Sequence, residues 1–329
     1  MSKQNLFVDP LARLHCKSLK YLFFLTLNLL ASSALFSQAP AGMDSIPQPT
    51  PSRITLTLDP SSLAKYDYSP PVNYWRVAAV TGASAATLGL SYVYVKNSWW
   101  AERPSTFHFD EGKDLRYSHN IDKFAHFYGG AIGTDLFYGA LRWAHLSESS
   151  AYLFGAGLSS FVQFAMEMKD AFAPRWGFSV YDVCTGVAGA FLPVGKRYVP
   201  ALRDIDIKWS YYKKSQHYFD INPHGTANDD YEGQTYWVAI KVNNLLPQSL
   251  EKIWPDIFGI AIGMSLDTEN DGNGGGNVEW FLALDYDLTH FIPSNNSFWE
   301  GVKHYLNYIH LPSPAIRFTP SIVWYGLYF

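Results

Sequence analysis

The stretch DKFAHFYGGAIG, residues 122–133, decides the fold, because it places polar groups and glycines at helical spacing within one short segment. Asp122 and His126 are four residues apart, so they lie on one face of a helix. Gly129 and Gly133 repeat this interval, which lets two helix backbones approach closely in membrane bundles and in soluble ones. The stretch therefore predicts a close-packed helical bundle with polar side chains between its helices.

Three further segments have the same small-residue character, with pairs such as Gly186 and Ala190. We expect helices over residues 74–95, 121–143, 149–172 and 179–192. Pro174 and Pro193 are expected to end the last two of them. The first helix is long enough to cross a bilayer but only moderately apolar, so a membrane span and a buried soluble helix are equal alternatives.

Beyond residue 200 the sequence changes to alternating, aromatic-rich segments, which predict antiparallel strands. The expected strands are 205–212, 217–221, 235–243, 258–266, 278–288 and 316–329, with an amphipathic helix at 299–308. The terminal phenylalanine resembles the end of an outer-membrane barrel, although six or seven strands are fewer than the smallest barrels have. A periplasmic sheet packed on the helices is the alternative. The expected fold class is α+β, a Gly-rich bundle of about four helices followed by an antiparallel aromatic-rich sheet or partial β-barrel.

The composition of the 329-residue chain narrows the class of protein further. Hydrophobic residues make up 48%, aromatic residues 17% and charged residues only 16%. These proportions exclude a disordered chain and suit buried surfaces and membrane–water interfaces. A formal net charge of -4 argues against a nucleic-acid partner, which would require a basic face. We therefore expect membrane lipid or other envelope components as partners.

The N-terminal residues predict export to the cell envelope. An apolar run at residues 21–30 follows basic residues, precedes small ones and is too short to cross a bilayer. We expect a signal peptide over residues 1–37, cleaved between Ala34 and Gln38, with an N-terminal membrane anchor as the alternative. The mature protein would then lie in the periplasm or at the outer membrane, with a Pro-rich linker (38–71), a helical domain (72–200) and a β-rich region (201–329).

The two cysteines cannot form a disulfide framework or a thiolate metal cluster. Cys16 precedes the apolar run, so it cannot be the lipidated first residue of a mature lipoprotein. Cys184 has valines close to it on both sides, and we expect it to be a buried small residue rather than a nucleophile.

Polar side chains concentrate between residues 122 and 182 in an otherwise apolar setting. The candidate catalytic residues are Asp122, Lys123, His126, Glu167, Asp170, Ser179 and Asp182. We expect the acids and the histidine to converge between the helices, where they must be paired, share a proton or bind a cation. Pairing with Lys123 or Arg175 would make a structural network, and Ser179 and Asp182 also fit a simple helix cap. A divalent cation such as Mg, Mn or Zn would instead indicate chemistry.

Three segments carry a family resemblance: DKFAHFYGGAIG, EMKDAF at 167–172 and SVYDVCTGVAGA at 179–190. Their pattern, D-K-x-x-H, then E-x-x-D, then S-x-x-D before a Gly-rich helix, resembles the YfiM-like family of predicted periplasmic lipoproteins. A weaker likeness reaches the VanZ-like membrane proteins. The resemblance covers roughly residues 70–195 and implies a periplasmic location and the same candidate residues, but no established activity. The chain departs from the lipoprotein members because it lacks a lipidation cysteine after the apolar run.

Two functions follow from these observations. The first is a membrane-associated envelope protein that is structural or contacts lipid, and the second is an enzyme that modifies an envelope lipid or glycan with the Asp/His/Glu cluster. A separate loop, DTENDGNGGGNVE at 267–279, approaches a calcium-binding EF-hand through Asp267, Glu269 and Asp271. Its Gly and Asn content is more typical of a hairpin tip.

Overall fold

The structure, a computed structural model, describes residues 70–329 except 114, 215–216, 268–275 and 292–295. The predicted signal peptide and nearly all of the predicted linker lie outside the described residues. Most of the EF-hand-like loop lies outside them as well.

Four long helices precede the sheet, as the sequence predicts. They are α3 (Tyr74–Trp99), α4 (Ile121–Trp143), α5 (Glu148–Asp170) and α6 (Val180–Tyr198). The prediction that Pro193 ends the last helix is wrong, because α6 continues through it to Tyr198. Proline removes one helical hydrogen bond, and burial of Pro193 and Val194 in the packed bundle offsets that cost.

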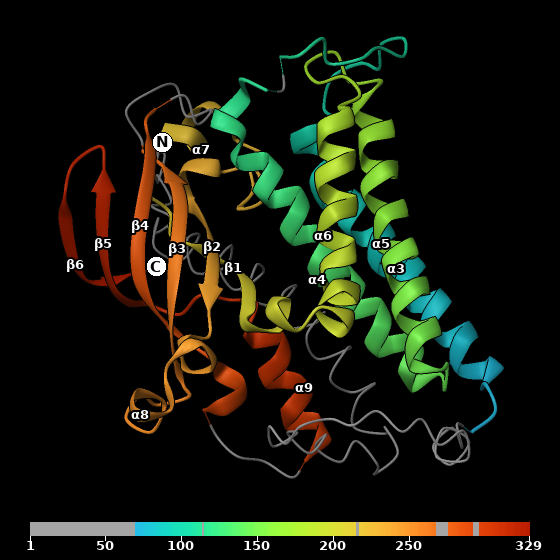
Figure 1. The fold of residues 1–329 in the computed structure, drawn as a ribbon. Coiled ribbons are helices and arrows are strands. Elements are labelled where there is room, and N and C mark those ends of the chain that lie inside the picture. The colour runs from blue at the N-terminus through green and yellow to red at the C-terminus, as the bar shows by residue number, and fades with distance from the viewer. Residues whose placement is uncertain (1–69, 114, 215–216, 268–275, 292–295) are drawn as a thin grey trace, which may run out of the picture.

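Glycines set the close approach of α4 and α6. A Cβ atom on Gly130 would overlap the carbonyl oxygen of Gly186, and one on Gly189 would overlap that of Phe127. Only glycine permits this contact, so the small-residue spacing quoted from the sequence acts directly in helix packing. Helix α4 also packs against α5 and the first two strands, and therefore lies at the centre of the molecule (Figure 1).

The second half of the chain is one antiparallel sheet with the strand order β1-β2-β3-β4-β5-β6. The strands are β1 (Ile205–Tyr211), β2 (Gln234–Ile240), β3 (Phe258–Leu266), β4 (Val278–Tyr286), β5 (Ser313–Thr319) and β6 (Val323–Tyr328). Short helices α7 (His217–Ile221) and α8 (Gln248–Glu251) and the amphipathic α9 (Ser297–Leu306) lie between strands. The fold class α+β is confirmed.

Two strand predictions are wrong. Residues 217–221 form α7 rather than a strand, because a five-residue segment is too short for its alternation to distinguish the two. Residues 316–329 are not one strand, because the chain turns at Pro320 and Ser321 and makes the β5–β6 hairpin. A proline and a serine are common turn residues.

The sheet is curled but not closed. Its two faces differ: Tyr236 and Met264 pack against Ile121 and its neighbours on α4, whereas Trp237 and Phe281 form a second core on the opposite face. At the edge of the sheet, the ring of Phe329 stacks on that of Tyr212 just after β1, with centroids 5.8 Å apart. In the described residues β6 nevertheless makes no ladder with β1, so the predicted barrel is at most partial.

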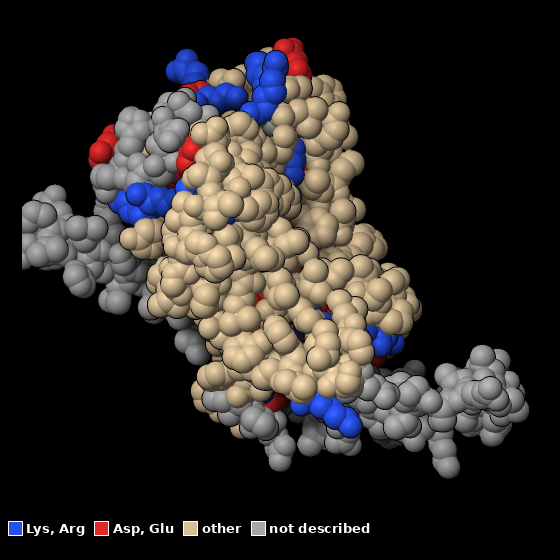
Figure 2. Space-filling view, turned by 60° about the vertical axis from the view of Figure 1, so that its left-hand side comes forward, with Lys and Arg blue, Asp and Glu red and all other residues tan. Residues whose placement is uncertain are grey.

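The outer surface of the helices is apolar. Phe161 on α5 has 64% of its surface exposed, and Leu90 on α3 has 52%. Cys184 also lies exposed, so the expectation that it is buried is wrong. The outer face of α6 is itself apolar, so the valines next to Cys184 in the sequence do not indicate that it is buried. Figure 2, in which the left-hand side of Figure 1 with the sheet is turned forward, shows few charged side chains across the middle of that face and more of them toward its ends.

Helix α3 is the one helix of the described residues that is long and apolar enough to cross a membrane, by length and composition. Only 6% of its most apolar window is buried inside the protein. Helix α3 is therefore not the buried helix that the sequence allowed as an alternative to a membrane span.

Candidate functional site

The candidate site begins with a sharp turn at the start of α4. Ser118, His119 and Asn120 have φ angles of 44°, 49° and 65°, which is the left-handed region that non-glycine residues seldom adopt. The turn is followed at once by Ile121, which is fully buried against the sheet. The strained backbone thus fixes the direction of the Asp122 side chain at the N-terminal end of α4.

Lys123 joins two carboxylates from different helices. Its Nζ lies 3.0 Å from Asp122 Oδ2 on α4 and 2.8 Å from Asp182 Oδ1 on α6. All three side chains are nearly buried. Lys123, one of the two cations that the sequence offers as partners of the acids, lies between two of them.

His126 lies one helical turn further along α4 and faces α5. Its Nε2 is 3.5 Å from Glu167 Oε1, and its Nδ1 is 2.9 Å from Gln163 Oε1. Gln163 occupies space that a side chain at Gly186 would fill, since a Cβ atom there would lie 2.8 Å from Gln163 Cγ. The amide and the carboxylate together hold the imidazole ring between the two helices.

Glu167 and Ser179 connect α5 to the start of α6. The backbone N–H of Ser179 donates a hydrogen bond to Glu167 Oε2 at 3.2 Å. The backbone N–H of Asp182 donates to Ser179 Oγ at 3.1 Å, so Ser179 is the N-cap of α6, as the S-x-x-D spacing suggested. Glu167 is therefore oriented from both sides, by a backbone donor and by His126.

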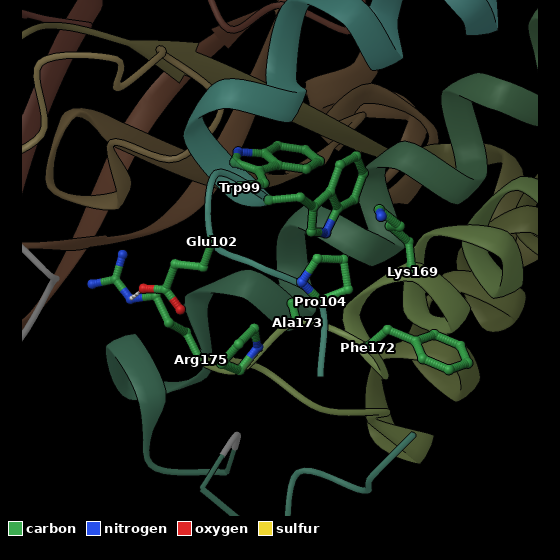
Figure 3. A pocket seen from close by; sticks show the side chains of 9 residues that line it. Trp99, Glu102, Pro104, Lys169, Phe172, Ala173 and Arg175 are labelled. Carbon is green, nitrogen blue, oxygen red and sulfur yellow. Dashed lines mark ion pairs between the residues drawn. The ribbon is translucent and has the colours of Figure 1, made fainter. Parts of the chain in front are cut away.

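Asp170 and Arg175 have other partners. The indole Nε1 of Trp100, at the end of α3, donates to Asp170 Oδ1 at 2.6 Å. Arg175 is exposed and its Nε lies 3.7 Å from Glu102 Oε1, a pair drawn in Figure 3 beside a small hollow of about 20 Å³. That volume holds about one water molecule. Lys123, and not Arg175, is thus the cation that the structure places among the acids.

Among the contacts described above, carboxylates outnumber cations. Three buried carboxylates, Asp122, Glu167 and Asp182, have one lysine and one histidine beside them. With all three ionised, the group carries one excess negative charge if His126 is protonated and two if it is neutral. A buried excess of this kind favours a bound cation or a shared proton.

The ligand geometry for a cation is present. One atom each of His126, Glu167 and Asp182 can be chosen so that all lie within 4.8 Å of one another. One imidazole and two carboxylates suit Zn, Mn or Mg without selecting one. The same set also suits acid–base chemistry, with His126 moving a proton and Glu167 orienting its ring.

Two groups at this site were not among the sequence candidates. Gln163 lies four residues before Glu167 and on the same face of α5, so its helical spacing could have identified it. Tyr231 comes from the loop before β2, and no local pattern connects it to α4. Burial, with the carboxylate of Asp122 nearby, raises the pKa of Tyr231 well above its usual value, so Tyr231 is a neutral phenol beside the acids.

The fold and the site together define a bundle of helices around a carboxylate–lysine–histidine cluster, with a curled sheet packed on its central helix. Residues 110–194, about a quarter of the chain, match the family described as "Predicted periplasmic lipoprotein (DUF2279)". The matched segment contains all seven candidate residues and supports a periplasmic location in the cell envelope. No curated protein and no solved structure matches the chain.

Proposed function

We propose that this protein is an exported, membrane-associated envelope protein whose helical face contacts lipid. The observation that carries the proposal is the exposed apolar surface of α3 and α5. Large exposed apolar patches are rare in soluble proteins, and in a membrane protein the exposed apolar side chains face the acyl chains. The family match to predicted periplasmic lipoproteins, and the resemblance to YfiM-like and VanZ-like proteins, are compatible with this role.

The aromatic residues of α3 support the proposal. Tyr74 and Trp75 stand at one end of the helix, and Trp99 and Trp100 at the other. At 1.5 Å per residue, the 26 residues of the helix extend over roughly 39 Å. The hydrocarbon core of a bilayer is about 30 Å thick, and tryptophan and tyrosine prefer the two interfaces that border it. The aromatic residues therefore lie where two membrane interfaces would be.

The polar contacts of α3 are also at its ends. Arg76 Nη1 donates to the carbonyl oxygen of Trp143 at 2.9 Å, and Trp176 Nε1 donates to the carbonyl oxygen of Trp99 at 3.1 Å. Between these ends, only Val80 and Val95 of the helix are buried. A helix fixed at both ends with an apolar exposed middle is suited to lipid contact.

Two leucines of nearly equal exposure test the proposal. Leu90 on α3 is 52% exposed, and Leu250 on α8, outside the helical face, is 50% exposed. The cost of an aspartate in the hydrocarbon core predicts that Leu90→Asp weakens binding to lipid vesicles roughly 100-fold. Leu250→Asp introduces the same charge outside that face and is the matched control. Vesicle flotation of the purified full chain measures both variants, with circular dichroism as the check on folding.

Equal flotation of the two folded variants would contradict lipid contact through α3. A loss in both would mean that any added negative charge repels the vesicle, and this too would count against the proposal. Neutral phosphatidylcholine vesicles keep that electrostatic effect small.

A second candidate function is an enzyme that modifies an envelope lipid or glycan. The observation in its favour is the position of His126 between Gln163 and Glu167, with Glu167 oriented by Ser179. In this role His126 would be the general acid or base, and Glu167 and Asp182 would hold a cation or a shared proton. Its test is the Glu167→Gln variant, which keeps the shape of the side chain and removes the charge that the role requires.

A further inference from the structure

A second polar region lies far from the candidate site, where the C-terminal end of α6 meets β1 and α9. It is a cleft of about 650 Å³, within the range of small-ligand pockets. Asp135, which lines it, is thirteen residues beyond Asp122 on α4, or roughly 20 Å along the helix. Most of its lining residues lie outside the segment that matches the periplasmic family.

Positive charge exceeds negative charge on the walls of this cleft. Four lining residues are basic (Lys196, Arg197, Arg203 and Lys241) and three are acidic (Asp135, Glu148 and Asp206). Two of the lysines share one acid, since Lys196 Nζ lies 2.7 Å from Asp206 Oδ1 and Lys241 Nζ lies 3.5 Å from Asp206 Oδ2. Lys241 Nζ lies closer to Asp287 Oδ2, at 3.0 Å, and Arg197 pairs with Glu148, so these three basic residues each have a carboxylate partner.

Arg203 is held in place by backbone groups. Its Nε donates to the carbonyl oxygen of Lys196 and its Nη2 to that of Arg197, both at 2.9 Å. Within the described part of the chain no carboxylate is seen to pair with Arg203. A guanidinium has five N–H donors in a planar fork, so several donors are left for a ligand while the backbone contacts fix its orientation.

His304 adds a further donor group at the cleft. Its Nε2 lies 2.9 Å from Asp135 Oδ2, which also accepts a hydrogen bond from the hydroxyl of Tyr308 at 2.7 Å. Burial alone would lower the pKa of His304, but the hydrogen bond to Asp135 raises it above the ordinary histidine value. The ring is thus held at the cleft that Arg203 and the two lysines also line.

We propose that this cleft binds a phosphate group carried by a small ligand. Phosphate is multiply charged and accepts several hydrogen bonds, so it fits a cleft where Arg203, Lys196 and Lys241 come together. The cleft is much larger than phosphate alone, and Tyr152, Leu192 and Ile207 supply apolar walls for the rest of the ligand. A lipid headgroup and a soluble phosphate ester both have this chemistry.

Inorganic phosphate is the first probe. Titration calorimetry of the full chain in detergent should detect binding, and Arg203→Gln should weaken it about tenfold because charge-assisted hydrogen bonds are lost. The matched control is Arg103→Gln, which removes an exposed arginine that does not line this cleft. Neither arginine is buried, and Arg203 contacts only backbone carbonyls, so both variants should fold.

Two further ligands distinguish the sources of the phosphate. A lipid headgroup is identified if short-chain phosphatidylglycerol binds more tightly than glycerol 1-phosphate and Arg203→Gln weakens the binding of both. Glycerol 1-phosphate that binds at least as well would identify a soluble ester. Absence of binding for all three probes, or equal loss in Arg203→Gln and Arg103→Gln, would overturn the proposal. Failure of the Leu90→Asp test would not affect this result, because the cleft does not involve α3.

Discussion

Buried charges are organised differently in the two halves of the molecule. In the sheet, two interior acids have cations of their own: Lys208 Nζ lies 2.8 Å from Asp285 Oδ2, and Lys214 Nζ lies 2.7 Å from Glu279 Oε2, which also pairs with Arg317. In the bundle, three acids share Lys123 and His126. The paired charges of the sheet are those of a structural network, whereas in the bundle more carboxylates than cations are in contact, which is the arrangement that a functional site would require.

The largest effect that tests this comparison is expected at Lys208. Its side chain is fully buried, and its Nζ also donates to the carbonyl oxygen of Tyr286 and to Asn307 Oδ1. Lys208→Met would leave Asp285 as an unpaired buried charge and should lower the free energy of unfolding by about 3–5 kcal/mol. Urea unfolding measures this change, and Lys252→Met, at an exposed lysine, is the control. A cost below about 1 kcal/mol would contradict the structural role of the pair.

The pH dependence of stability provides a second test of the comparison, through His310. This side chain is buried in the sheet and stacks on Trp237, with ring centroids 4.0 Å apart. Burial, and then the nearby ammonium of Lys208, lowers the pKa of His310 from 6.5 to about 3. Below pH 6.5 the unfolded histidine binds a proton and the folded one does not, so stability falls as the pH falls.

From pH 6.5 to 5 this linkage should remove about 1.5 kcal/mol from the free energy of unfolding. Burial raises the pKa of Asp285, although Lys208 acts to lower it. At still lower pH, protonation of Asp285 in the folded protein therefore increases stability and opposes the loss caused by His310. The measurement is urea unfolding at both pH values for the wild type and for His310→Leu. An identical pH dependence in the two proteins would show that His310 is not the group responsible.

The smallest effect on stability is expected at Glu167 of the bundle, and Glu279 of the sheet is its matched comparison. Glu167→Gln removes one of the excess charges in the bundle and should change the free energy of unfolding by less than about 1 kcal/mol. Glu279→Gln leaves Lys214 and Arg317 without their carboxylate and should cost about 1–3 kcal/mol.

Metal analysis of the same two variants tests the cation at the bundle site. A cation held by His126, Glu167 and Asp182 should be reduced in Glu167→Gln and retained in Glu279→Gln. If the bundle variant loses as much stability as the sheet variant, and the metal content is equal, the charges of the bundle are a structural network as well.

The helices and most strands could be predicted because their signals are local. The glycine spacing around Gly129 and Gly186 can be read within one helix, and the cap at Ser179 acts within three residues. The errors arose where a local signal competes with packing. Pro193 is tolerated because its neighbours are buried, and Cys184 faces outward on an apolar surface.

The sequence by itself determined that Asp122 and His126 share one helix face and that Glu167 lies on another, because the period of the α-helix is fixed. Only the tertiary structure decided that Lys123 joins Asp122 to Asp182, that Asp170 contacts Trp100, and that Tyr231 is buried near Asp122. It also decided the cleft at Arg203, whose walls come from segments far apart in the chain. These contacts depend on how helices and strands pack, and packing is set by shape and burial across the whole chain rather than by any local pattern.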